Sequence, residues 1–164
     1  MSTLTDALGA CARWQQPARP SAQAPLRLRC TLDEPATSAE VERFWADRQL
    51  PSGLLEAWSV CREARLFEDA DYGQWGLHLL APSASATRTE EELAQRPEDY
   101  SAVDIVIAEF LGDQDLLVLD KQAGVLVALP LDQRSDWYRP ASSMAEFFAR
   151  YVAAGGDKYW EARR

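Results

Sequence analysis

The densest hydrophobic stretch of the chain, residues 103–130, predicts three β-strands joined by two turns. Its three apolar runs are Val103–Leu111, Leu116–Leu119 and Val125–Leu129. Many of their residues are β-branched or aromatic, and such side chains pack well on a pleated sheet. The short connections, Gly112–Asp115 and Asp120–Gly124, suit antiparallel neighbours and therefore predict a meander. Because the runs are nearly continuous, we expect both faces of these strands to be covered.

Helical periodicity predicts two helices before this meander and one after it. Thr37 and Glu40 have the spacing of a capping box at the start of the first helix. The apolar face expected for this helix is Val41, Phe44 and Trp45. Pro51 suits the first turn of the second helix, because a proline there loses no hydrogen bond. The buried stripe expected for the second helix is Leu54, Leu55, Trp58 and Cys61. Ser142 or Ser143 is the expected cap of the last helix, Met144–Ala153.

The remaining segments predict short strands, loops and one more helix. The strand candidates are Leu26–Leu32, Arg65–Phe67 and Gln74–Leu80. Residues 68–73 predict an acidic turn, residues 81–89 a loop, residues 89–94 a short acidic helix and residues 132–140 a loop. Together these elements predict an α+β fold with a central, mainly antiparallel sheet. Two N-terminal helices and a C-terminal helix are expected to pack on that sheet.

Residues 1–25 predict an N-terminal extension with a proline-rich linker, ahead of a domain over residues 26–164. Leu4, Leu8 and Cys11 share one helical face, and Pro17, Pro20 and Pro25 mark the linker. We expect a short helix that leans on the domain. A frayed tail and a partner-binding arm are the alternatives.

Charge is unevenly distributed along the 164 residues. Residues 1–30 hold four Arg and one Asp, a net charge of +3, whereas residues 31–164 hold 13 basic and 25 acidic residues, a net charge of −12. Phosphate contacts need a basic surface, so this composition argues against nucleic acid as a partner of the domain. It favours attraction to basic partners.

The cysteines and the apolar runs indicate the cellular compartment of the protein. Three cysteines without a C-x-x-C spacing fit a reducing cytosol better than a disulfide framework. The N-terminus does not have the pattern of a secretory signal, and no apolar run approaches the ~18 residues of a membrane span. We therefore expect a cytoplasmic protein that does not contact a membrane.

Few residues suggest catalysis or metal binding. His78 is the only histidine, and with three scattered cysteines it makes a zinc site or a nucleophile–histidine pair a poor hypothesis. Asp69, Asp71 and Gly73 resemble the start of a calcium loop, but the later ligand positions do not follow. We therefore expect no catalytic residue, metal or cofactor. A carboxylate-dependent hydrolase is the enzymatic alternative.

Four stretches, in this order and spacing, resemble the SUKH superfamily, which includes Syd, fungal cell-wall synthesis regulators and bacterial toxin-immunity proteins. They are residues 35–44, the Leu-Pro-started segment 50–58, the Gly-Asp turn and strands within 110–125, and residues 141–148. The resemblance covers about residues 33–153, so the expected domain over 26–164 is SUKH-like. Residues 1–25 have no counterpart in it.

The resemblance implies a non-enzymatic protein-binding module. The leading hypothesis is an immunity protein that occludes the active site of a cognate toxin, a basic nuclease being one candidate. A regulatory or scaffold protein of the cell-wall regulator type is the alternative. A monomer is slightly favoured over an oligomer.

The predicted partner contacts are acidic residues at expected turns and three aromatic residues. They are Glu68, Asp69, Asp71, Tyr72, Asp113, Asp115, Asp132, Asp136, Trp137 and Tyr138. The alternative for each acidic residue is a solvated turn position. The alternative for each aromatic residue is packing in the core.

Overall fold

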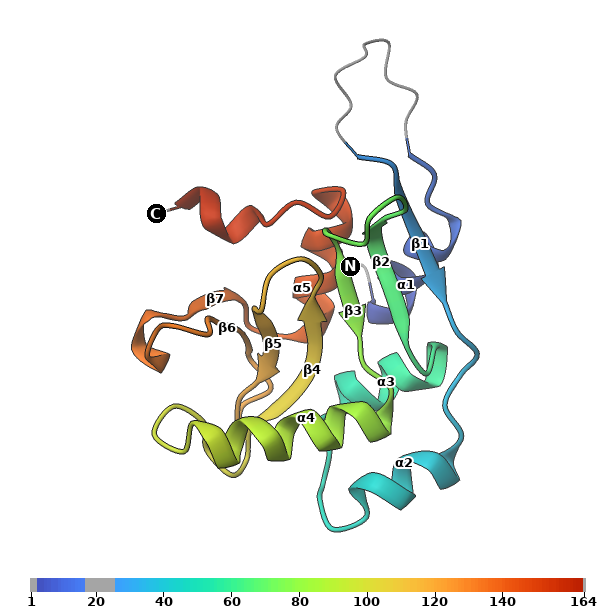
Figure 1. The fold of residues 1–164 in the computed structure, drawn as a ribbon. Helices are drawn as coiled ribbons and strands as arrows, with labels where there is room; N and C mark the ends of the chain where they lie inside the picture. The colour runs from blue at the N-terminus through green and yellow to red at the C-terminus, as the bar shows by residue number, and fades with distance from the viewer. Residues whose placement is uncertain (1–2, 17–25, 164) are drawn as a thin grey trace.

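The strands of this chain form one antiparallel sheet. The structure is a computed structural model that describes residues 3–16 and 26–163 (Figure 1). Within these ranges seven strands lie side by side in chain order, from β1 at one edge to β7 at the other. Their bounds are β1 Leu28–Leu32, β2 Ala64–Asp69, β3 Leu77–Leu79, β4 Ile105–Phe110, β5 Leu116–Leu119, β6 Val125–Ala128 and β7 Tyr138–Ala141. The predicted meander is confirmed as β4, β5 and β6.

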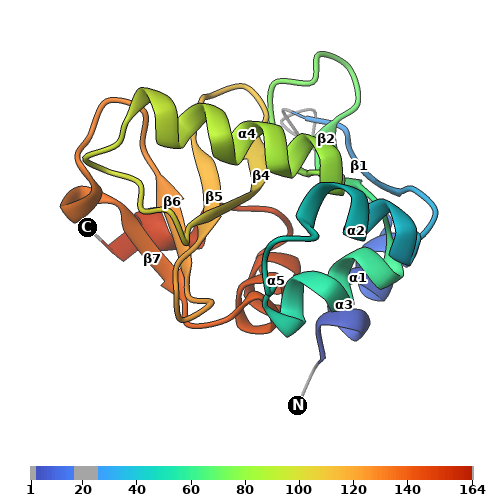
Figure 2. The same ribbon diagram turned by 90° about the horizontal axis from the view of Figure 1, so that it is seen from below.

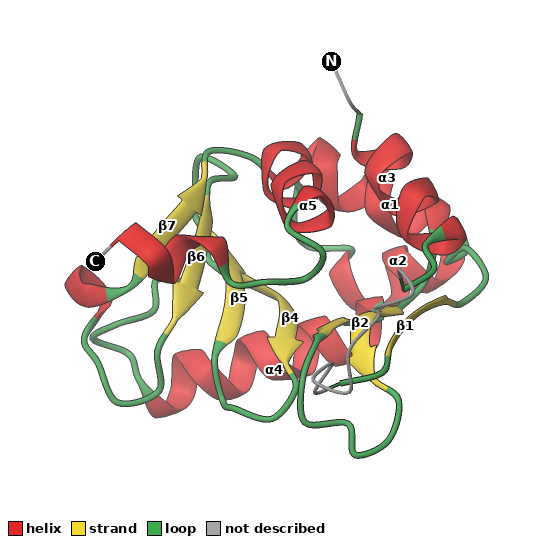
Figure 3. Cartoon of the chain, turned by 90° about the horizontal axis from the view of Figure 1, so that it is seen from above, coloured by secondary structure: helices red, strands yellow, loops and turns green. Residues whose placement is uncertain are grey.

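Helices cover both faces of this sheet. The described residues form five α-helices, which are α1 Leu4–Arg13, α2 Ser38–Trp45, α3 Ser52–Val60, α4 Pro82–Gln95 and α5 Met144–Ala153. Two short 3-10 helices, η1 Arg134–Asp136 and η2 Tyr159–Arg163, complete the chain. Helices α1, α3 and α5 lie on one side of the sheet and α4 on the other (Figures 2 and 3). The α+β fold and the predicted cover on both faces are therefore confirmed.

Two hydrophobic cores follow from this layering. The larger core lies between the sheet and the helices α1, α3 and α5, where Trp58, Phe147 and Tyr151 are almost fully buried. The smaller core lies on the α4 side, where Val106, Val118 and Leu126 meet Tyr100 and Trp137. Burial of apolar surface on both faces explains why the meander strands carry almost no polar residues.

The start of α2 shows the Thr37 half of the predicted capping box, and Ser143 caps α5 as predicted. Thr37 accepts a hydrogen bond from the Glu40 N–H at 3.1 Å, and Ser143 accepts one from the Glu146 N–H at 3.1 Å. Thr3 and Asp6 form a complete capping box at the start of α1. Each bond satisfies an amide that the first helical turn leaves unpaired.

Two residues expected to be buried are exposed. Phe44 on α2 is 39% exposed, and Leu55 on α3 is 44% exposed. Helix α2 instead anchors itself through Trp45, whose indole N–H donates to the Pro82 carbonyl at 2.9 Å. Helix α2 lies at the corner of the molecule beside α3 and α4 (Figure 2). Fewer of its apolar side chains are therefore buried than its sequence pattern predicts.

The predicted loop over 81–89 was wrong, because α4 is one helix that begins at Pro82. Its buried face is largely polar, so apolar periodicity could not reveal it. The Ser85 hydroxyl donates to the Val106 carbonyl at 2.6 Å, and the Thr89 hydroxyl accepts from the Val106 N–H at 2.9 Å. These bonds satisfy the backbone of β4 where its register with β5 shifts.

Two further predicted segments were wrong. Glu68 and Asp69 belong to strand β2 rather than to a turn. The predicted loop over residues 132–140 contains η1 and the start of β7. Strand β7 could not be predicted from the sequence, because it is short and contains Pro140. A proline is tolerated there because β7 lies at the edge of the sheet.

The predicted N-terminal helix leans on the domain as expected. Leu4, Ala7, Leu8 and Cys11 of α1 are buried in the larger core. The predicted proline-rich linker at residues 17–25 lies outside the described residues. The three cysteines are free. Among the described residues, no helix is both long and apolar enough to cross a bilayer.

We expect Gly112→Ala to lower the free energy of unfolding by about 2–3 kcal/mol. Gly112 has φ +88°, and an added Cβ would lie 1.8 Å from the Gln74 carbonyl oxygen. Urea denaturation measures the change. Gly73→Ala is the matched control, because Gly73 also has a positive φ, +64°, but open space around its Cα. Equal losses in the two variants would contradict the close approach of the two turns.

Candidate protein-interaction site

The turns that carry most of the predicted contacts meet at one end of the sheet. In a meander every second connection leaves the same end, so the β2–β3 turn (70–76) and the β4–β5 turn (111–115) are neighbours. The Leu111 N–H donates to the Gly76 carbonyl at 2.8 Å, which joins them. Asp71 and Tyr72 thereby lie in the turn next to the one that holds Asp113 and Asp115. We call this surface the acidic end.

The C-terminal segment completes the acidic end. The Lys158 ammonium contacts the carboxylates of Asp113 and Asp115, and it lies over the rings of Trp75 and Phe110 at 5.7 and 5.0 Å. Among the side chains that the structure describes, the cations of the acidic end are Arg27 and Lys158. Its carboxylates are Asp69, Asp71, Asp113, Asp115, Asp157 and Glu161. Six carboxylates against two cations leave a formal net charge of −4.

Local pairing shapes the charges of the acidic end. Arg27 donates to Asp71 at 2.5 Å, and this bond lowers the pKa of the Asp71 carboxyl, which stays ionised at neutral pH. Burial and the charge of Asp113 raise the pKa of Asp115. Burial alone would lower the pKa of Lys158, but its carboxylate partners raise it overall. The acidic end is therefore a fixed arrangement of charges rather than a set of independent side chains.

Exposure divides the predicted residues at this end. Tyr72 is 81% exposed at the tip of the β2–β3 turn, and the side chains of Asp71 and Asp113 are 39% and 40% exposed. Glu68, Asp69 and Asp115 are buried. Glu68 instead accepts hydrogen bonds from Arg29 and Arg65. Of the predicted contacts at this end, a partner can thus reach Asp71, Tyr72 and Asp113.

The other predicted residues lie in the connection from β6 to β7. Asp132 and Asp136 are exposed there. Trp137 is buried in the smaller core, and its indole N–H donates to the Asp132 carbonyl at 3.1 Å. Tyr138 packs against the larger core. By the same alternation this connection leaves the sheet at the end that holds the acidic turns, but Trp137 and Tyr138 pack into the two cores there.

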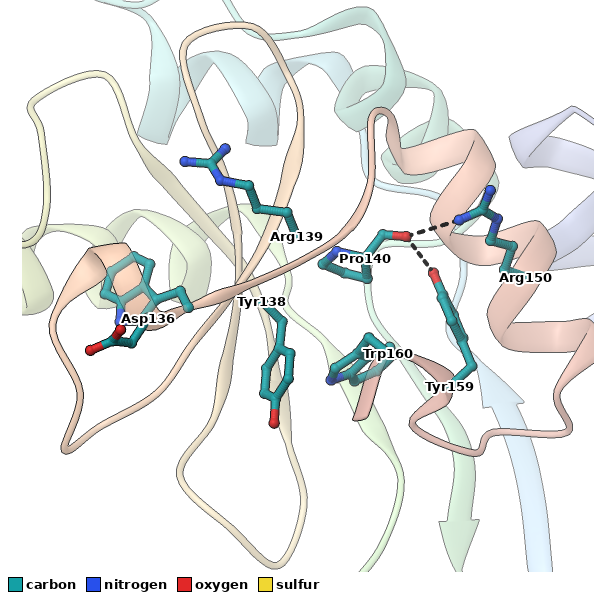
Figure 4. Close-up of a pocket in the computed structure, with 8 residues that line it drawn as sticks. Asp136, Tyr138, Arg139, Pro140, Arg150, Tyr159 and Trp160 are labelled. Carbon is teal, nitrogen blue, oxygen red and sulfur yellow. Dashed lines mark hydrogen bonds between the residues drawn. The ribbon is translucent and has the colours of Figure 1, made fainter. Parts of the chain in front are cut away.

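Asp136, Trp137 and Tyr138 instead line a pocket of about 360 Å³ (Figure 4). Its other walls come from β7, α5 and η2, and they are Arg139, Pro140, Arg150, Tyr159 and Trp160. The Pro140 carbonyl accepts hydrogen bonds from Arg150 at 3.2 Å and from the Tyr159 hydroxyl at 3.1 Å. We call this cavity the aromatic pocket. Its walls come from separate elements of the chain, so no local sequence pattern predicts it.

A wider groove of about 670 Å³ bears on the hydrolase alternative, because Asp99, Asp104 and Asp120 line it. Each carboxylate is bonded within the loops. Asp99 accepts from the Arg134 N–H at 3.0 Å, Asp104 from the Arg134 guanidinium at 2.5 Å and Asp120 from the Gly124 N–H at 3.0 Å. This geometry gives the three carboxylates a structural role.

The only histidine lies on the sheet between two carboxylates. The His78 ring nitrogens are 2.9 Å from Glu63 and 3.3 Å from Glu109. The contact with Glu109 contributes most to a raised pKa of His78, burial opposes it, and Glu63 adds to it. His78 therefore forms a charged cross-strand cluster with its neighbours.

We expect the His78 ring to titrate with a midpoint above its ordinary pKa of 6.5. A raised folded-state pKa stabilises the protein fully below 6.5, and this stabilisation is lost as the pH rises through the raised value. The chain has one histidine, so a single NMR ring signal reports the titration. Glu109→Gln should move the midpoint down. A wild-type midpoint at or below 6.5 would contradict the cluster.

Comparison with known proteins adds no family. A scan against protein-family models and a search of curated protein sequences both gave no match to this chain.

Proposed function

We propose that this chain is a cytoplasmic, SUKH-like immunity protein that binds a cognate toxin and occludes the toxin's active site. The acidic end supports the proposal. It gathers negative charge from two turns that are distant in the sequence, around one exposed aromatic side chain, Tyr72. Charged residues around an aromatic anchor are a common arrangement at protein interfaces.

The charge of the acidic end selects the kind of partner. Toxins that act on nucleic acids expose basic substrate-binding clefts, and a surface with a net charge of −4 attracts such a cleft. Complementary fields steer encounter and raise association rates by ~10–10³. The same field repels nucleic acid, which is why we propose a protein partner.

The proposed action requires no chemical step on this protein. Tyr72 would enter a pocket of the toxin and slow dissociation, while Asp71 and Asp113 would pair with basic residues around that pocket. Inhibition would then depend on shape and charge. The wide groove has no part in it, and its residues Asp99, Asp104 and Asp120 are bonded within their own loops.

Co-expression with the toxin encoded by the neighbouring gene tests the proposal. Growth should be restored, and the two proteins should co-elute as a stable complex on size exclusion. Tyr72→Ala should lose rescue while keeping its fold, because Tyr72 is 81% exposed. Absence of both rescue and complex with every neighbouring gene product would overturn the proposal. A stable complex with a partner that is not a toxin would support the regulatory or scaffold alternative instead.

A further inference from the structure

The aromatic pocket contains a buried hydrogen-bond donor without an acceptor. Trp160 is 5% exposed, and its indole N–H finds no acceptor among the described residues. The other buried indoles are satisfied: Trp45, Trp58 and Trp137 donate to backbone carbonyls at 2.9, 3.0 and 3.1 Å. A buried donor left unpaired destabilises a protein, so the Trp160 N–H marks a place where an acceptor would bind favourably.

The unpaired donor is directed toward the pocket. Figure 4 shows the indole nitrogen of Trp160 on the side that faces Tyr138, which also lines the pocket. The rings of Tyr138 and Tyr159 and the pyrrolidine of Pro140 supply apolar walls around it. An occupant therefore needs a hydrogen-bond acceptor beside a compact apolar group.

Contacts within the protein hold most of the pocket wall in place. The Trp160 ring packs against Phe110, Phe147 and Tyr159 with centroids 5.5, 5.6 and 5.0 Å apart. Arg150 and the Tyr159 hydroxyl both donate to the Pro140 carbonyl. The indole nitrogen itself has almost no exposed surface, so a ligand carbonyl reaches it only after a neighbouring side chain of the wall moves, while the rest of the wall keeps its shape.

These features favour proline over other residues. A proline residue offers a free carbonyl and a compact apolar ring, and it has no N–H. The last property matters, because the Pro140 carbonyl in the pocket wall already accepts two hydrogen bonds. A ligand N–H would have to compete with them. Extended proline-rich segments dock in aromatic-lined grooves for the same reasons.

We propose that the aromatic pocket binds a proline-containing, extended segment of a protein partner, with the Trp160 N–H donating to a ligand carbonyl. The site is distinct from the acidic end, and the inference does not depend on the toxin hypothesis. It also gives Trp160 a role besides packing in the core.

NMR titration of the full ¹⁵N-labelled chain tests the inference. The probe is an acetylated, amidated decaproline, and the control is an acetylated, amidated (Gly-Ser)₅ peptide. Decaproline should shift the Trp160 indole signal saturably and leave the Trp45 and Trp58 signals unmoved. The Gly-Ser peptide should bind at least ~10-fold more weakly. Trp160→Phe keeps an aromatic ring without the N–H, and it should weaken decaproline binding by ~10-fold.

The remaining outcomes are also decisive. No shift of the Trp160 signal at millimolar decaproline would overturn the inference. A Gly-Ser peptide with one central leucine that shifts this signal as strongly as decaproline would do the same, since the pocket would then take any apolar side chain. If Trp160→Phe does not fold, the comparison of the three peptides on the wild-type chain still decides.

Discussion

We expect Arg134→Ala to lower the free energy of unfolding by about 3–5 kcal/mol. The Arg134 guanidinium bonds both oxygens of Asp104, at 2.5 and 3.1 Å, and the Asp104 side chain is only 1% exposed. Arg134 also donates to the Asp99 carbonyl and lies over the Trp137 ring. Its removal leaves a buried carboxylate without its counter-charge. Urea denaturation measures the loss.

Arg139→Ala is the matched control for this prediction. Arg139 is 65% exposed and lies 3.6 Å from Asp120, so its removal should cost less than about 1 kcal/mol. Adding Asp104→Asn to Arg134→Ala should recover part of the loss, because the second change removes the unpaired charge. Similar small losses for Arg134→Ala and Arg139→Ala would show that the buried pair does not hold η1 against the domain.

We expect Asp71→Lys with Asp113→Lys to slow association with the toxin by about 10- to 100-fold at low salt. The double change takes the formal charge of the acidic end from −4 to 0. Both residues lie in exposed turns, and Asp115 remains as a carboxylate partner of Lys158, so the fold should persist. Stopped-flow association at several salt concentrations measures the effect, which should shrink as salt screens the field.

The control places the same charge change away from the acidic end. Asp47 and Glu90 are exposed next to α2 and on α4. Asp47→Lys with Glu90→Lys should slow association far less, because steering depends on where the charge lies as well as on its total. Equal slowing by the two double variants would mean that only net charge matters, and the acidic end would lose its special role.

The sequence could predict elements whose signal is local. Capping at Thr37 and Ser143 and the apolar runs of the meander each depend on residues close together in the chain. Helix α4 could not be predicted in full, because Ser85 and Thr89 face the sheet with hydroxyl groups that bond the backbone of Val106. A helix face with such hydroxyl groups is buried only because the strand it packs on supplies hydrogen-bond partners, and the local sequence does not show those partners.

In the candidate site, too, the parts that depend on local sequence could be predicted and the parts that depend on distant residues could not. Chemistry at turns correctly singles out Asp71, Tyr72 and Asp113 as exposed, and their meeting at one end follows from the alternation of a meander. The part played by Lys158 could not be predicted, because it lies more than 40 residues beyond the turn that it closes. The aromatic pocket depends on the same C-terminal segment folding back, through Trp160, onto Phe110.

Titration of the toxin with this protein tests most directly whether it acts by binding alone. Toxin activity should fall in proportion to added protein, reach zero at an equimolar ratio, and return when the two are separated. An enzyme would behave differently, because substoichiometric amounts would inactivate the toxin and activity would stay lost after separation. That second result would contradict the account.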